Sequence, residues 1–161
     1  MEKVFESERI NFIKISKDLI DDYLKMVNDP AVATKIRREP IYFSYDDEVK
    51  WIEGKLAKKA NIYSMIEKKS GDFVGNIDFV KIDGKEAEVG IAITPEKQNL
   101  HFGTEALKAL IEFGRNHLGL ESFYLNVLDE NSRAIHCYEK VGFVKSGIGE
   151  HEHDIHMVYK K

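Results

Sequence analysis

The stretch Thr94-Pro95-Glu96-Lys97-Gln98-Asn99-Leu100-His101-Phe102-Gly103-Thr104 joins two segments of different periodicity. Residues 87–93 before it form an apolar run typical of a strand, and residues 103–118 after it have the spacing of an amphipathic helix. The first N–H groups of a helix have no intrahelical partner, and the helix dipole places partial positive charge on them. The junction therefore predicts an anion site, and a phosphate-bearing ligand is the first hypothesis.

The segments around this junction predict a single mixed α/β domain over residues 1–161. About four helices are expected, starting near residues 16, 44, 103 and 131, where capping residues precede helical spacing. Three consecutive hairpin strands are followed by a strand–helix–strand crossover, so the sheet should be mixed and mostly antiparallel. The strands are expected at residues 9–15, 62–67, 73–82, 85–94, 122–127, 143–148 and 155–159.

Composition narrows the class of protein. The formal net charge of −4 gives no broad basic surface for nucleic acid, and the basic cluster at residues 35–38 is interpreted as a solvated loop. The lone Cys137 excludes an internal disulfide and is interpreted as a packed thiol. No apolar run approaches a membrane span of about 18 residues, and the charged start does not read as a signal peptide, so the cytoplasm is the default location. The sequence does not decide between a monomer and a homodimer.

The strand before the junction has one face made of Glu88, Gly90 and Ala92. Gly and Ala pack poorly in a strand interior, and Gly there often marks a close approach of another group. Two interpretations remain open. A helix lies tightly on this face, or the face is a slot in which an extended ligand reaches main-chain groups.

A second group of residues lies on the helix expected at residues 131–141. Asn131, Ala134 and Tyr138 share one side of this helix. A phenol on that side needs a partner from the protein or from a ligand. Tyr138 is therefore either a satisfied core tyrosine or a proton donor.

Together these residues resemble the GCN5-related N-acetyltransferase (GNAT) superfamily, and more narrowly its ribosomal-protein and diamine acetyltransferase branch. The resemblance covers the order of elements along essentially the whole chain. It implies a sheet splayed between two parallel central strands, and acetyl transfer from acetyl-CoA to a primary amine by direct attack. The residues that carry it are Glu88 to Ile93, Pro95, Gln98, Gly103 to Ala106, Asn131, Ala134, Tyr138, Glu139, Gly142 and Phe143.

The resemblance also implies a role for each matching residue. The main chain of the strand would bind the pantetheine arm and polarise the thioester carbonyl. The loop would cradle the pyrophosphate, Asn131 and Lys140 would contact the cofactor, and Tyr138 would protonate the departing thiolate. The strand residues are Ile91, Ala92 and Ile93, and the loop residues are Gln98, Asn99, Leu100, His101, Phe102, Gly103 and Thr104.

Two residues carry open alternatives. Glu88 is the candidate base that takes the ammonium proton through water, or else an exposed polar strand residue. His101 replaces the first glycine of the family's anion loop. Because the phosphate ligands are main-chain N–H groups, binding of coenzyme A is expected to persist. The alternative is an acetyl-CoA-binding module with weak or no catalysis.

The segment at residues 150–156, Glu-His-Glu-His-Asp-Ile-His, would border the acceptor site in this superfamily. Its three acidic residues indicate a cationic amine, such as a polyamine or a basic peptide N-terminus. The His-x-His pattern is compatible with metal binding, but a solvated hairpin is the preferred interpretation, and no metal site is expected.

Overall fold

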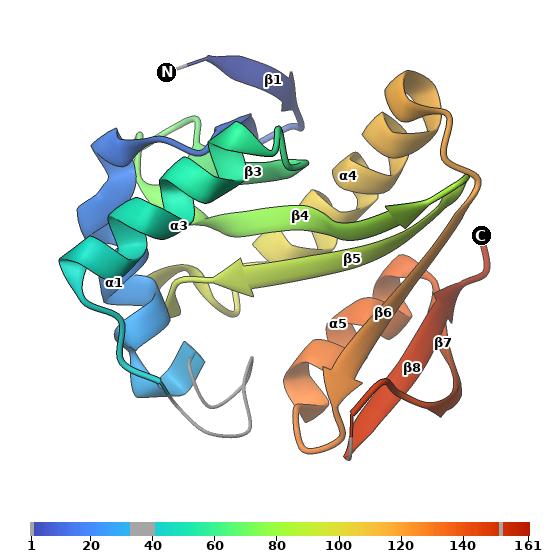
Figure 1. Ribbon diagram of the computed structural model, residues 1–161. Coiled ribbons are helices and arrows are strands. Elements are labelled where there is room, and N and C mark those ends of the chain that lie inside the picture. The colour runs from blue at the N-terminus through green and yellow to red at the C-terminus, as the bar shows by residue number, and fades with distance from the viewer. Residues whose placement is uncertain (1, 33–40, 152) are drawn as a thin grey trace.

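The computed structural model describes residues 2–32, 41–151 and 153–161, and the basic cluster at 35–38 lies outside them. One eight-stranded sheet runs through the described part in the order β1-β2-β3-β4-β5-β6-β8-β7 (Figure 1). The pair β5–β6 is parallel and the other pairs recorded in this part are antiparallel, which confirms the expected mixed sheet. The strands are β1 Lys3–Glu6, β2 Ile10–Lys14, β3 Ile62–Glu67, β4 Phe73–Asp83, β5 Glu86–Ile93, β6 Ser122–Leu128, β7 Phe143–Ile148 and β8 Asp154–Tyr159.

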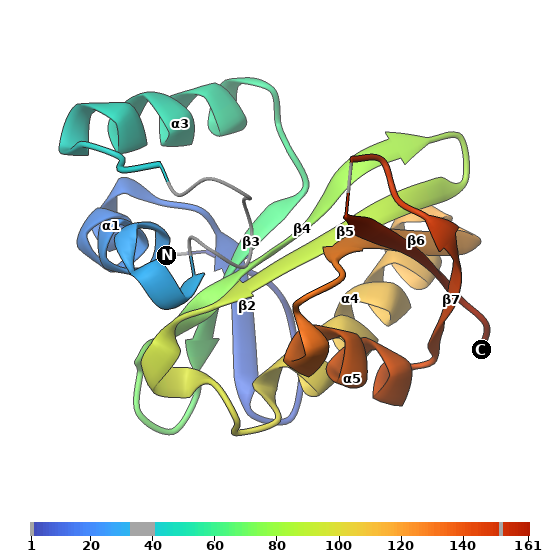
Figure 2. The same ribbon diagram turned by 90° about the horizontal axis from the view of Figure 1, so that it is seen from below.

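Four longer helices cover the two faces of the sheet, as Figure 2 shows. Helices α1 (Ile20–Asn28) and α3 (Tyr45–Ala57) lie on one face, and α4 (Phe102–Leu118) and α5 (Ser132–Val141) lie on the other. Each pair has its own apolar core against the sheet. Single 3₁₀ turns precede α1 (Lys17–Leu19) and follow β5 (Pro95–Lys97). Among the described residues, no helix combines the length and apolarity needed to cross a bilayer.

Local sequence signals account for most helix boundaries. Ser44 and Asp47 form a reciprocal capping box at the start of α3, and Gly119 ends α4 in the left-handed conformation at φ 67°. Strand β1 was not predicted, because its four residues carry no clear alternation. Tertiary packing holds it: the ring of Phe5 stacks on those of Phe12 and Phe113, with centroids 4.2 and 4.3 Å apart.

The parallel pair β5–β6 is short, and this shapes the site. Recorded pairing between the two strands joins Glu86 to Ser122, Ala87 to Phe123 and Glu88 to Tyr124, and stops there. Beyond Glu88 the strands diverge, and Figure 1 shows the wedge that opens between them. The splay implied by the family resemblance is therefore present.

Candidate active site

The main chain of β5 faces the wedge at alternate residues. The Lys85 carbonyl, just before the strand, accepts from the N–H groups of Glu121 and Ser122 at 2.8 and 3.2 Å. At the other end, the Thr94 N–H donates to the Val74 carbonyl at 2.9 Å. Main-chain groups alternate sides along a strand, so odd-numbered residues point toward β6 and even-numbered ones toward β4.

This alternation places Ile91 and Ile93 at the open edge, where the resemblance assigns the pantetheine arm. The main chain of Ala92 faces β4, and its side chain packs against the core under α1 and α3. Contact of Ala92 with the cofactor stays a prediction.

The side chain of Gln98 is held by two hydrogen bonds near the surface. Its amide nitrogen donates to the Ile93 carbonyl at 3.0 Å, and its amide oxygen accepts from Arg133 of α5 at 2.7 Å. Gln98 thereby fixes the end of β5, and Arg133 brings a cation to the loop at residues 98–104. Sequence reasoning missed Arg133, because only the fold brings α5 beside this loop.

The N-terminus of α4 is open to an anion. His101 is the N-cap residue, with φ 67° and ψ 15°, and its side chain makes no capping hydrogen bond. Glu105 N–H donates to the His101 carbonyl at 3.3 Å, so the amides of residues 102–104 come before the first intrahelical bond. Asn99 is also left-handed, at φ 63°. The loop thus keeps the left-handed backbone that a glycine would adopt. This conformation strains any residue with a Cβ, but histidine is found in it more often than most residues.

His101→Gly is expected to stabilise the protein by about 1 kcal/mol, because glycine adopts φ 67° without a Cβ penalty. The affinity for coenzyme A should change by less than about threefold, since the main-chain donors are unchanged. Urea unfolding and calorimetric titration with coenzyme A would measure both quantities. Gly71 is another left-handed residue with free space around it, so Gly71→Ala should lower the free energy of unfolding instead of raising it.

Glu105 anchors this helix start to the first hairpin. Its carboxylate accepts from the Ser7 hydroxyl at 2.5 Å, from the Arg9 N–H at 2.8 Å and from the Arg9 guanidinium at 2.7 Å. The guanidinium also lies 4.2 Å from the ring centre of Phe102. These contacts hold the first turn of α4 in a fixed orientation and lower the pKa of Glu105 despite its partial burial.

Tyr138 lies on α5 against the larger core, and its ring meets that of Phe143 edge-on at 6.3 Å. No hydrogen bond to its hydroxyl is present within the described residues. Burial raises the pKa of this phenol above its ordinary value, with a small addition from the neighbouring Cys137. A partly buried phenol that stays protonated and lacks a protein partner among the described residues has the properties required of a proton donor to a ligand.

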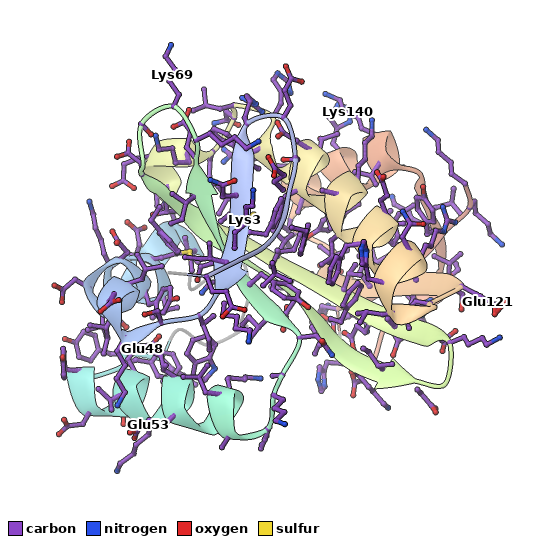
Figure 3. The ribbon with its side chains drawn as sticks, turned by 90° about the horizontal axis from the view of Figure 1, so that it is seen from above. Lys3, Glu48, Glu53, Lys69, Glu121 and Lys140 are labelled. Atoms are coloured by element: carbon purple, nitrogen blue, oxygen red, sulfur yellow. The ribbon has the colours of Figure 1, made fainter. Side chains whose placement is uncertain are left out.

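Three other residues of α5 have separate surroundings. Asn131 is the N-cap, and its side-chain oxygen accepts from Ala134 N–H at 3.4 Å, which leaves its amide nitrogen for a ligand. Lys140 is exposed and points outward, away from the sheet (Figure 3). The thiol of Cys137 lies 3.5 Å from the Thr104 hydroxyl and packs on α4.

The opposite face of the wedge holds Glu88 and a polar hollow. Glu88 belongs to the last β5–β6 pair, and its carboxylate accepts from the Asn126 amide at 3.2 Å. The adjoining cavity of about 610 Å³ is lined by residues of β4, β5, β6 and the β7–β8 hairpin, namely Val80, Lys81, Glu88, Tyr124, Asn126, Ile148, Gly149, Glu150 and His156.

Acidic side chains outnumber lysines in the lining of the hollow, with Glu88 and Glu150 against Lys81. Its Tyr124 side chain has a raised pKa because of burial and then the charges of Glu88, Glu86, Glu150 and Asp83. The ring of His156 stacks on Tyr124 at 5.2 Å, and its Nδ1 lies 2.5 Å from the Ser146 hydroxyl. Among the described residues, no group of three His, Cys, Asp or Glu side chains converges in an arrangement for a metal.

Sequence reasoning also missed Asp78, which lies on β4 opposite Gly90 of β5. A Cβ on Gly90 would be 2.8 Å from the Asp78 carboxylate and 2.9 Å from a Val80 methyl group. The glycine at position 90 is therefore explained by these two side chains, and not by a helix packed on the strand or by an empty slot. Side chains from the next strand fill the space. The available signal was a single acid within the apolar run at residues 73–80.

The open-wedge architecture is that of known acetyltransferases. A GNAT-family acetyltransferase from Bacillus anthracis superposes with a TM-score of 0.84 at 20% identity, covering 95% of each chain. A spermidine N-acetyltransferase from Vibrio cholerae, solved with CoA and spermine, superposes with a TM-score of 0.80 at 21% identity, covering 94% of this chain and 95% of that one. At these identities the similarity establishes the fold.

The family follows from the sequence itself. Residues 9–144 match the family described as Acetyltransferase (GNAT) domain, and the chain belongs to this family. The spermidine N(1)-acetyltransferase of Escherichia coli K12 is 37% identical over 92 residues, which is 56% of this chain and 50% of that relative. The aligned part thus spans half the length of that relative. The family and fold predicted from the sequence are confirmed.

Proposed function

We propose that the protein transfers an acetyl group from acetyl-CoA to a primary amine by direct attack. The observation that carries this proposal is the open edge of β5, where the main chains of Ile91 and Ile93 face a wedge. Membership of the acetyltransferase family supports the same reaction. The surrounding residues fit the cofactor, since α4 offers free amides for a pyrophosphate and Tyr138 offers an unpartnered phenol.

When bound, acetyl-CoA would supply a thioester as the acyl donor. A main-chain N–H of β5 would donate to its carbonyl oxygen and stabilise the charge that develops there. Tyr138 would give its proton to the sulfur as the carbon–sulfur bond breaks. A carboxylate beside the wedge would take the proton of the incoming ammonium. The sequence suggested Glu88 for this role, and a second carboxylate lies nearby on β4.

We further propose that the acceptor is a cationic amine bound in the hollow beside Glu88. Glu88 and Glu150 line this cavity, and the nearby charges of Glu86 and Asp83 have the same sign. The relative from E. coli bears the name spermidine N(1)-acetyltransferase, which makes spermidine the natural first probe.

Two measurements test the function. Calorimetric titration with acetyl-CoA tests the cofactor, and thiol release with spermidine or with peptide N-termini tests the transfer. Saturable binding with thiol release from one amine class is expected. Binding without release across both classes would favour a non-catalytic binding module, and absence of binding at millimolar acetyl-CoA would overturn the proposal.

Glu150→Gln is expected to raise the KM for spermidine several-fold and to change kcat little, because the carboxylate borders the hollow at an exposed position. The effect should shrink as salt rises. Glu112→Gln is the matched control, since Glu112 is exposed on α4, on the opposite face of the sheet. Equal KM values for both variants would remove Glu150 from acceptor binding.

A further inference from the structure

Asp78 lies beside the start of the wedge. It pairs across the strands with Gly90, which is two residues beyond Glu88, where the β5–β6 pairing ends. Its carboxylate oxygen would be 2.8 Å from a Cβ on Gly90, so it lies against the main chain of β5 just past the last β5–β6 pair. Asp78 and Glu88 therefore place two carboxylates at the point where β5 and β6 separate.

The fold makes no evident use of this carboxylate. Asp78 is half-buried, and no hydrogen bond or ion pair holds it within the described part of the chain. An acid that is partly removed from water without a partner destabilises a protein, and such groups concentrate at functional sites. By comparison, the neighbouring buried polar residues form a chain, in which Tyr23 contacts Ser64 at 2.5 Å and Ser64 donates to Asn76 at 2.8 Å.

The charged groups around Asp78 come from two packed elements. Lys55 of α3 lowers its pKa and Glu88 of β5 raises it, but burial is the largest effect, and the pKa rises to about 7. A small hollow of about 210 Å³ beside Asp78 is also lined by Lys58, Lys59 and Lys81.

We propose that Asp78 takes the proton from the acceptor ammonium, while Glu88 holds the cation at the branch point. This inference rests on the proposed acetyl transfer. The proton moves from R–NH₃⁺ to the carboxylate, and the freed nitrogen lone pair forms the bond to the acetyl carbon. The carbon–sulfur bond breaks and the thiolate takes its proton from Tyr138. The second nitrogen proton, lost as the amide forms, restores the Tyr138 phenol, and Asp78 returns its proton to solvent.

The test is the pH dependence of kcat/KM with acetyl-CoA and spermidine. In the unmodified protein, kcat/KM should rise with pH and level off above about pH 7, because Asp78 must be ionised to accept a proton. Asp78→Asn should lower kcat at least 100-fold and remove this rise, with the affinity for acetyl-CoA changed less than twofold. Glu88→Gln should keep the rise and increase the KM for spermidine. Asp21→Asn, on exposed α1, is the control.

Several results would overturn the assignment. One is an Asp78→Asn variant that keeps the rise in kcat/KM and turns over within threefold of the unmodified protein. Another is a carbon-13 titration that places the Asp78 pKa below 5, which remains informative if the variant does not fold. A protein that binds acetyl-CoA but acetylates no amine would instead overturn the proposed function, so the two failures are distinguishable.

Discussion

Replacing Tyr138 with phenylalanine is expected to lower kcat by about 100-fold or more and to leave acetyl-CoA binding within twofold. The ring would keep its packing beside Phe143, at a centroid distance of 6.3 Å, so the loss isolates the hydroxyl. Burial keeps the pKa of this phenol above its ordinary value, so the proton stays available throughout the neutral and mildly alkaline range. Steady-state thiol release and calorimetry measure the two quantities.

Tyr159→Phe is the matched control for this variant. Its ring lies 5.4 Å from that of the same Phe143, but its hydroxyl has no role in the proposed reaction. Turnover in the control should stay within twofold of the unmodified protein. If the two variants had equal turnover, Tyr138 would be a core tyrosine and the thiolate would leave without it.

Gly75→Ala is expected to destabilise the protein by more than about 3 kcal/mol, the largest stability effect that we expect for a single methyl group. Gly75 has φ 156°, and a Cβ there would lie 2.0 Å from the Ala92 carbonyl oxygen and 3.0 Å from the Ile93 Cα. Relief requires the end of β5 to move, so acetyl-CoA affinity should fall as well. Urea unfolding, followed by titration of the folded fraction, would measure both effects.

Gly71→Ala separates backbone strain from this clash. Gly71 is left-handed at φ 77° with nothing within 4 Å of an added Cβ, so alanine should cost only about 1 kcal/mol there. Equal losses of unfolding free energy for both variants would mean that β4 and β5 adjust freely to the added methyl group, and the predicted clash with Ala92 would be wrong.

Patterns local to the sequence predicted most elements. Alternation and turn residues placed β3 at 62–67 and β7 at 143–148, as observed, and Gly119 marked the end of α4. The junction at 94–104 pointed to the anion site, because a strand followed by a helix start is a local feature. The family resemblance then indicated the splay between the parallel strands.

What the sequence did not reveal depends on contacts between strands. Asp78 is a candidate functional residue because its carboxylate lies against Gly90 on the neighbouring strand. Gly75 must be glycine because a Cβ there would clash with the Ala92 carbonyl. The contact of Gln98 with Arg133 joins residues 35 positions apart. No periodicity encodes such pairings, because they depend on strand register and on the packing of α5 beside the loop. For the same reason the sequence alone does not show whether the main-chain groups of Ala92 face β4 or β6.

The shortness of the parallel ladder also bears on how the two sides of the site can change. Only three pairs couple β5 to β6 among the described residues, and the β7–β8 hairpin, which contributes Glu150 and His156 to the hollow beside Glu88, follows β6 and α5. Substitutions in this hairpin can therefore alter the lining of the hollow while the main chain at Ile91 and Ile93 keeps its place. The hollow is the adaptable side of the wedge, and the open edge of β5 is the constant side.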